Sequence, residues 1–296
     1  MAQNDIATKQ NEQTFIDRLA AQRHLYSKSK ELSSLLFIVC VALPVALAIA
    51  KVLYSNCFYL PKVVVVYSFV ATLLRFWLKD LAVKRKNLAA RIQQLFDCEL
   101  FGLKWNKPLC GLKPKPEEVY NAAKDANYKN LNDWYEPIVS ELPLSVGSLV
   151  CMRTNVVYDQ SLRKSYSTLC NILTALAIIT VVVFGMWNNT GLWDCFLYGI
   201  VPLMPLVSWG IDLYKQHNAN FSALNNIESL INDGLIEAKT NQSVSTNSLD
   251  DIQNFMFLHR QSSYLIPDLF YKMNRKKNEK TAFYGANEIC KMYNLL

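Results

Sequence analysis

Four apolar runs, each about 18 to 21 residues long and nearly free of charge, constrain this chain more than any other feature. They cover residues 33–50, 58–78, 169–187 and 192–211. A helix needs roughly 20 residues, at about 1.5 Å per residue, to cross about 30 Å of hydrocarbon. The buried helix of a soluble protein usually keeps one polar face, whereas the stretch 63–74 offers only Tyr67, Ser68 and Thr72. The sequence therefore predicts an all-α membrane protein with four transmembrane helices.

The positions of lysine and arginine predict how these helices are oriented. Basic residues cluster at one end of every apolar run, whereas the opposite ends carry only Lys51 and Lys62. Positively charged segments stay in the cytoplasm, so both termini and the long middle segment are predicted to be cytosolic. The residues that lead to this orientation are Arg23, Lys28, Lys30, Lys79, Lys84, Arg85, Lys86, Arg163, Lys164 and Lys215.

The chain is therefore expected to divide into two hairpins and three cytosolic segments. We expect a cytosolic N-terminal helix at 1–31, a transmembrane hairpin at 32–78, a cytosolic helical segment at 79–168, a second hairpin at 169–211 and a cytosolic helical segment at 212–296. Short turns make each pair of spans antiparallel, and the three cytosolic segments together form one helical domain. The formal net charge of +7 follows from the basic inner face. This charge favours a lipid bilayer as partner and requires no DNA or RNA polymer.

Local signals place several cytosolic helices. Thr14 with Asp17 has the spacing of a capping box, and the helix that it starts is predicted to continue into the first apolar run. The helix after the second run is expected to end near Gly102. Ser248 is expected to cap a later helix, and the last helix is expected over 279–293.

Catalytic and metal-binding signatures are absent from the sequence. It contains no G-x-S-x-G, no H-E-x-x-H and no phosphate-binding glycine loop. The three histidines are isolated, and the eight cysteines are scattered singly without a C-x-x-C pair. We therefore expect no enzyme, no metal site and no cofactor. Cys57 and Cys195 are both predicted on the outer face, where a disulfide between them stays open because sequence carries no distance.

Three prolines lie within the predicted spans. Pro44 is in the first span, and Pro202 and Pro205 are in the fourth. A proline inside a helix removes a backbone hydrogen bond and favours a kink. These kinks are either gating hinges or the ordinary irregularity of membrane helices, in which proline is common.

Aromatic and arginine residues alternate through the cytosolic segments. Aromatic faces stack on bases and guanidinium groups pair with phosphates, so these residues are candidates for a nucleotide pocket. Within the stretch CMRTNVVYDQSLRKSY (151–166), Asn155, Asp159 and Arg163 are four apart and share one helix face. A helical ion pair, with tyrosines that pack between helices, would also explain the pattern. The other candidates are Trp134, Tyr135, Arg153, Tyr158, Tyr166, Arg260, Tyr264, Tyr271 and Arg275.

Four segments resemble one known family. They are RLAAQRHLYSKSK (18–30), QQLFDCELFGLKWN (93–106), CMRTNVVYDQSLRKSY (151–166) and IPDLFYKMNRKKNEK (266–280). In this order around four apolar runs, and over about residues 11–290, they resemble the SMODS-associated four-transmembrane (S-4TM) effector family. By position, the family's polar signature corresponds to Trp105, Asn106, Arg153, Asn155, Asp159, Arg163, Pro267, Asp268, Tyr271 and Arg275.

The resemblance implies a pore-forming effector of a bacterial cyclic-nucleotide anti-phage system (CBASS). Such an effector lies in the inner membrane, and a nucleotidyltransferase is encoded beside it. It stays quiet until a cyclic dinucleotide or oligonucleotide, made during infection, engages its cytosolic part. It then opens or disrupts the membrane, and the cell dies or stops growing in abortive infection.

Two functions from different classes follow from these patterns. The first is a ligand-gated pore, which we expect to be a homo-oligomer because four mostly apolar helices cannot line a wide aqueous path. Its subunits would meet through serine and threonine residues, Asn171 and Tyr67, and the polar face at 153–163 would couple ligand sensing to the membrane helices. The alternative is a membrane scaffold or sensor that recruits a cytosolic partner without forming a pore. An enzyme acting on lipid headgroups has the least support, because no nucleophile, base or metal constellation is present.

Overall fold

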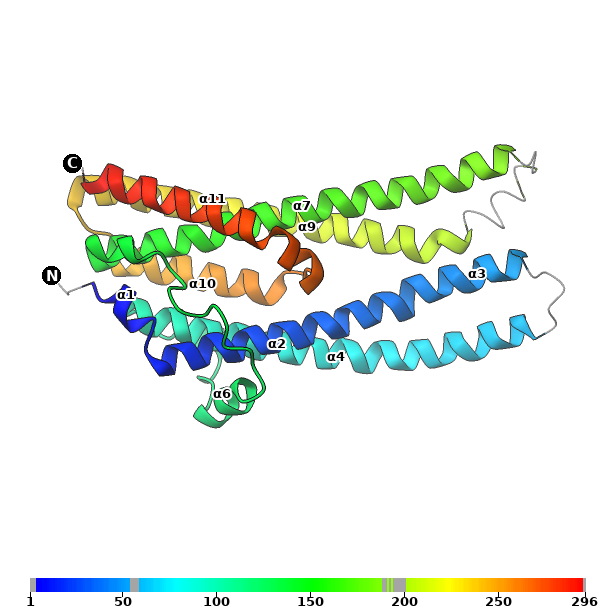
Figure 1. Cartoon of the computed structure of the whole chain (residues 1–296), viewed down its shortest axis with the longest axis horizontal. Helices are drawn as coiled ribbons and strands as arrows, with labels where there is room; N and C mark the ends of the chain where they lie inside the picture. The colour runs from blue at the N-terminus through cyan, green and yellow to red at the C-terminus, as the bar shows by residue number, and fades with distance from the viewer. Residues whose placement is uncertain (1–3, 54–58, 188–190, 192, 194–200, 295–296) are drawn as a thin grey trace.

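The computed structural model describes residues 4–53, 59–187, 191, 193 and 201–294, and every regular element in these ranges is helical. The elements are α1 (Ile6–Lys9), α2 (Gln13–Phe37), a π-helical turn (Ile38–Ala42), α3 (Leu43–Leu53), α4 (Leu60–Phe101), α5 (Lys107–Cys110), α6 (Pro116–Ala123), a 3-10 turn (Pro137–Glu141), α7 (Leu144–Trp187), α9 (Val201–Asn241), α10 (Thr246–Ser262) and α11 (Asp268–Asn294). Two pairs of long helices run along the longest axis, α2–α3 beside α4 and α7 beside α9 (Figure 1). The predicted all-α class is confirmed for the described residues.

We call the four long helical segments that carry the apolar runs limbs and number them in chain order. The first limb is continuous from the N-terminal arm into the first apolar run. α2, the π-helical turn and α3 follow one another without a break, as predicted for this segment. The π-helical turn ends at Ala42, two residues before Pro44. Pro44 has no amide hydrogen, so a widened turn beside it accommodates the missing bond of the ladder. The hydroxyl of Tyr67 donates a hydrogen bond to the Val39 carbonyl in this turn. Tyr67 therefore makes a hydrogen bond within its own chain, whereas we expected it to contact other subunits.

The second pair of limbs begins with a single helix. α7 joins the polar stretch 151–166 to the third apolar run, so Asn155, Asp159 and Arg163 do share one face of a helix that continues past them. In α9 the proline inside the helix is Pro205. Pro202 is the second residue of α9 as described, and residues 194–200 before this helix are outside the described residues, as are Cys57 and Cys195.

Helix ends agree with the sequence in some places and differ in others. α4 ends at Phe101, and its cap residue Gly102 has a left-handed φ of 70°, as predicted for an end near Gly102. Leu103 N donates to Cys98 O (2.8 Å) and closes the helix. The proposed capping box at Thr14 is wrong, because α2 starts one residue earlier, with Glu12 as its cap residue and no side-chain cap bond. α10 is capped by Ser245, which accepts from Ser248 N (3.1 Å), three residues before the predicted cap.

The last helix is longer than predicted. α11 starts at Asp268 and not near 279. Its first part is rich in lysine and polar residues and carries no strong apolar stripe, so periodicity did not mark it as helix. Figure 1 shows α11 lying along the N-terminal half of α7, and packing against that helix holds it in place.

One hydrophobic core joins both pairs of limbs at the ends that lie away from the apolar runs. It contains side chains from α1, α2, α4, α7, α9, α10 and α11. Tyr135, only 1% exposed, lies in it with its ring centroid 5.7 Å from that of Phe101. The loop 124–143 is thus anchored between helices, which places its residues against α2 and α7.

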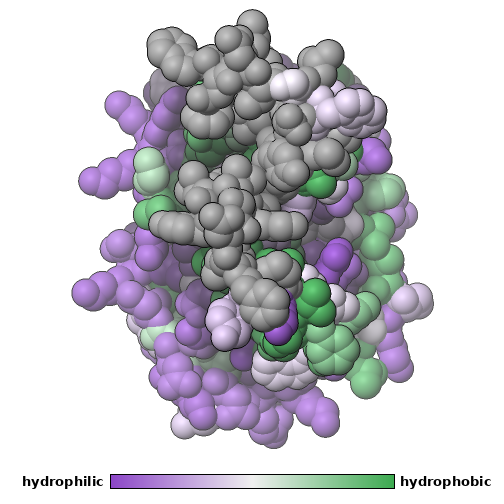
Figure 2. All heavy atoms as spheres, turned by 90° about the vertical axis from the view of Figure 1, so that its right-hand side faces the viewer, coloured by the Kyte–Doolittle hydropathy of each residue, from purple (hydrophilic) through white to green (hydrophobic). Residues whose placement is uncertain are grey.

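Apolar side chains dominate the opposite end of the molecule. Among the described residues, one helical stretch, Gln13–Leu47, is long and apolar enough to cross a membrane by length and composition alone. Figure 2 looks onto this end, where hydrophobic side chains gather around the grey atoms and hydrophilic ones form much of the outer rim. The cysteines among the described residues, which are Cys40, Cys98, Cys110, Cys151, Cys170 and Cys290, are all free thiols.

Gly147 permits a close approach between the start of α7 and the 3-10 turn. A β-carbon at this position would lie 2.7 Å from the Val139 carbonyl oxygen and 2.6 Å from Asn4 Nδ2. Gly147→Ala should therefore lower the free energy of unfolding by about 1–3 kcal/mol, despite the higher helix propensity of alanine. Chemical denaturation in detergent would measure it. Gly285→Ala in α11, where only Arg153 Nη1 comes within 3.4 Å, is the matched control and should not destabilise the protein.

Candidate functional site

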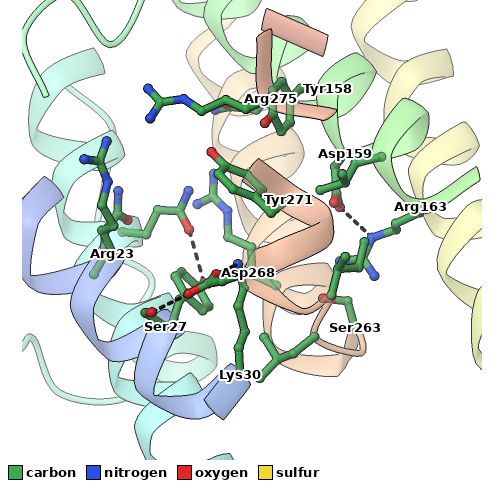
Figure 3. A pocket seen from close by; sticks show the side chains of 18 of the residues that line it. Arg23, Ser27, Lys30, Tyr158, Asp159, Arg163, Ser263, Asp268, Tyr271 and Arg275 are labelled. Atoms are coloured by element: carbon green, nitrogen blue, oxygen red, sulfur yellow. Dashed lines mark hydrogen bonds and ion pairs between the residues drawn. The ribbon is translucent and has the colours of Figure 1, made fainter. Parts of the chain in front are cut away.

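A cavity of about 740 Å³ lies between α2 on one side and α7, α10 and α11 on the other. We call it the central cavity. Ten of the candidates named from the sequence line it, and Figure 3 shows several of them around the opening. These ten are Trp134, Asn155, Tyr158, Asp159, Arg163, Arg260, Tyr264, Asp268, Tyr271 and Arg275. The lining does not include Trp105, Asn106, Tyr135, Arg153, Tyr166 or Pro267, and Arg153 lies beside Gly285 of α11.

The lining of the central cavity carries an excess of positive charge. Eight lysine and arginine residues line it, against four aspartate and glutamate residues. Sequence reasoning missed three of its polar residues on α2, which are Arg23, Ser27 and Lys30. Their spacing of four and three does place them on one helix face, but only the folded chain shows that this face meets α11.

Arg23 and Arg275 form a cationic corner of the cavity. The Arg23 guanidinium donates to two backbone carbonyls, Nη1 to Lys129 O (2.7 Å) and Nη2 to Asn130 O (3.1 Å), and has no carboxylate partner among the described residues. Burial, together with the nearby charge of Arg275, lowers the pKa of Arg23. Figure 3 places both guanidinium groups on the same side of the cavity. An anion bound there would relieve this repulsion.

Asp268 occupies a second cationic corner. Lys30 Nζ lies 2.8 Å from Asp268 Oδ1, and the Ser27 hydroxyl donates to Asp268 Oδ2. Burial would raise the pKa of Asp268, but Lys30 and Ser27 outweigh burial and lower it. Lys30 Nζ also lies 4.8 Å from the centroid of the Tyr271 ring. This corner therefore already holds an anion, which the protein itself supplies.

The polar face of α7 contacts two other parts of the chain, α10 and the turn before α11. Arg163 Nε donates to Asp159 Oδ2 (2.8 Å), and Arg163 Nη1 donates to Tyr264 O (3.0 Å) in the turn before α11. His259 Nε2 of α10 lies 2.7 Å from the same Asp159 oxygen. Burial would raise the pKa of Asp159, but Arg163 and His259 outweigh it and hold the pKa well below its usual range. The helical ion pair considered from the sequence is present, and it belongs to a wider network.

Asn155 continues the same face one turn earlier. Its Nδ2 donates to the Tyr135 hydroxyl (2.8 Å), which donates in turn to Asp97 Oδ1 of α4 (3.1 Å). α7 is thereby linked through the loop 124–143 to the first pair of limbs.

A buried ion pair lies beside the cavity. Arg260 Nη1 of α10 is 2.7 Å from Asp97 Oδ2 of α4, and the two side chains are 10% and 1% exposed. Gln253 Nε2 donates to the same oxygen (3.0 Å). Removal of either charge would leave the other one buried and uncompensated.

Aromatic rings and free polar atoms complete the lining. Five aromatic side chains contribute to it, and the rings of Tyr158 and Tyr271 lie 6.0 Å apart. Gln22 is 4% exposed, and its Oε1 has no hydrogen-bond partner among the described residues. Flat rings stack on bases, an unpaired carbonyl accepts from an amine, and guanidinium and ammonium groups bind phosphate. Across the part of the chain that the structure describes, no group of three or more His, Cys, Asp or Glu side chains could hold a metal ion.

Comparisons with known proteins agree with this description. The family model "SMODS-associating 4TM effector domain" matches residues 4–289. A protein of Bacillus cereus (strain VD146) named "Probable CBASS effector molecule" is 24% identical over 298 residues, which cover 97% of this chain and 99% of the relative. No solved structure matches. The family match spans nearly the whole chain, and the chain therefore belongs to the SMODS-associating four-transmembrane effector family.

Proposed function

We propose that this protein is a membrane effector of anti-phage defence that binds a cyclic oligonucleotide in the central cavity and then opens or disrupts the bacterial cell membrane. The observation that carries the proposal is the lining of the cavity, with eight basic residues against four acidic ones and five aromatic rings. A ligand that combines phosphates with bases suits both features. The family and the name of the Bacillus cereus relative support the same role.

Exposed apolar side chains support the membrane part of the proposal. Val65, Phe69 and Phe76 of α4 are 70%, 68% and 72% exposed, and Leu173 and Ile179 of α7 are each 55% exposed. Contact between such continuous apolar surfaces and water costs free energy, whereas lipid chains or other subunits can cover these surfaces. We therefore propose four spans in two hairpins, at 32–78 and 169–211, with the termini and 79–168 in the cytoplasm.

Continuous helices can carry a change in the cavity to the membrane. α2 lines the cavity with Ser27 and Lys30 and runs on through the π-helical turn into α3. α7 lines it with Asp159 and Arg163 and runs on to Trp187. A ligand that shifts either face would tilt the limb attached to it. Pro44, beside the π-helical turn, is the proposed hinge of the first limb, and Pro202 and Pro205 are the proposed hinges of the fourth.

Dye release from liposomes tests the proposed function. Purified protein would be reconstituted with entrapped dye and exposed to a panel of cyclic dinucleotides and trinucleotides. We expect release with at least one of them, and release should rise steeply with the protein-to-lipid ratio because a homo-oligomer forms the path. A protein that binds a nucleotide and a cytosolic partner but never releases dye would instead act as a scaffold or sensor, and the pore proposal would be wrong.

Arg23 and Arg275 give a sharper test of the binding site. Arg23→Gln and Arg275→Gln should each weaken binding of the activating nucleotide about tenfold or more, because each removes a charged donor to phosphate. Isothermal titration calorimetry in detergent would measure the affinity. Lys280→Gln removes the same charge from the exposed side of α11 and should bind like the wild type. Equal affinities for all three variants would exclude the central cavity as the site.

A further inference from the structure

Asp268 links the two pairs of limbs at the membrane end of the cytosolic bundle. Its carboxylate makes both hydrogen bonds that the described residues form between the side chains of α2 and α11, one with Lys30 and one with Ser27. Lys30 precedes the first apolar run by three residues. α11 packs along α7, whose own continuation forms the third limb. The contact therefore joins the helix that leads into the first limb to the helix that supports the third (Figure 3).

The surroundings of the Asp268 carboxylate would suit a phosphate equally well. They comprise the Lys30 ammonium group, the Ser27 hydroxyl and the positive charge of Lys272, which helps to lower the pKa of Asp268. Asp268 also lies in the first turn of α11, a helix of 27 residues, where the helix dipole favours an anion. Each of these groups can donate to a phosphate oxygen or attract it.

The two cationic corners of the cavity differ in one respect. At the first corner, Arg275 Nε donates to Glu279 Oε1 of its own helix (2.6 Å), whereas Arg23 makes no ion pair with a carboxylate among the described residues, and burial together with the charge of Arg275 lowers the pKa of Arg23. The corner at Lys30 and Ser27 is filled by Asp268. A ligand with two phosphates can place one against Arg23, which has no carboxylate to give up. Its second phosphate would compete with Asp268 for Lys30 and Ser27.

Building on the proposed function, we propose that Asp268 is an internal anion that holds the effector closed until a ligand phosphate displaces it. While Asp268 binds Lys30 and Ser27, α2 and α11 stay together and the first limb cannot move away from the third. A phosphate that takes Lys30 and Ser27 releases α11 from α2 and adds contacts of its own. The ligand thus replaces the two side-chain hydrogen bonds that hold α2 to α11 and keep the protein inactive.

Charge exchange between the two residues tests this mechanism without any nucleotide. Lys30→Asp and Asp268→Lys each place like charges together, so each single variant should raise spontaneous dye release from liposomes roughly five- to tenfold. The double variant restores an ion pair in the opposite sense and should return release to the wild-type level. Asp268→Asn, which is a milder change, should raise spontaneous release to a smaller extent.

The control is a charge exchange at an exposed ion pair, and two outcomes would contradict the proposal. Glu288 and Lys291 form an exposed ion pair on α11, outside the cavity, at 3.2 Å, and exchanging their charges should leave spontaneous release unchanged. Single variants at 30 and 268 that release no more dye than the wild type would contradict the closing role of Asp268. A double variant that leaks as much as the single variants would contradict it too. Nucleotide-triggered release by the wild-type protein is measured separately, so this proposal can fail while the proposed function stands.

Discussion

Arg260→Met is expected to lower the free energy of unfolding of the helical bundle that contains α4 and α10 by about 3–5 kcal/mol. Asp97 is 1% exposed, and its partner Arg260 Nη1 lies 2.7 Å away. Methionine fills much of the same volume but leaves the Asp97 carboxylate charged and without its cation. The Tyr135 hydroxyl and Gln253 Nε2 still donate to Asp97, but neutral donors do not replace a charge at this depth.

Chemical denaturation in detergent, followed by tryptophan fluorescence, measures this loss. Lys84→Met is the matched control, because Lys84 pairs with Asp80 at 2.7 Å while both side chains are largely exposed. Exposed pairs contribute about 1 kcal/mol or less, so the control should remain close to the wild type. Equal stability of Arg260→Met and Lys84→Met would show that the buried pair does not hold α10 against α4.

Arg163→Glu is expected to reduce nucleotide-triggered dye release at least tenfold and to lower the free energy of unfolding by about 3 kcal/mol. Arg163 is 6% exposed, and it binds Asp159 within α7 and the Tyr264 carbonyl before α11. Glutamate would place a second carboxylate beside Asp159 and could not donate to Tyr264. The turn before α11 would then separate from the helix that continues into the third limb.

Two further variants separate coupling from stability in this prediction. Lys164→Glu makes the same charge change one residue away on the exposed side of α7, and it should leave release and stability unchanged. Arg163→Lys keeps the charge beside Asp159 but loses the planar donor geometry to Tyr264, so it should fold like the wild type while release falls. Unchanged triggering and unchanged membrane toxicity in Arg163→Glu would remove the coupling role of this face.

Local sequence patterns predicted the helices well because the causes of those helices are local. The end of α4 at Gly102 follows from the left-handed φ of 70°, which glycine adopts without strain. The polar stretch 151–166 and the third apolar run form one helix, α7, because no proline interrupts the sequence between them. The start of α11 at Asp268 was missed, because packing on α7 and the contacts of Asp268 with α2 stabilise that turn and its own periodicity does not.

The candidate site was predicted residue by residue but not as an arrangement. The spacing of Asp159 and Arg163 was enough to predict their contact, since residues four apart on a helix are neighbours. No spacing could predict that Lys30 binds Asp268, which is 238 residues away. Arg23 was likewise missed, because its role comes from Arg275 and from the carbonyl oxygens of a distant loop.

The sequence by itself determined that this chain is helical and where its long apolar segments lie, because each helix satisfies its backbone hydrogen bonds within a few residues. Only the tertiary structure decided which charges share the central cavity, which of them are paired and that Arg23 faces it without a carboxylate partner among the described residues. The physical reason is that the energy of an ion pair depends on separation in space and on burial, and neither quantity can be read from positions along the chain.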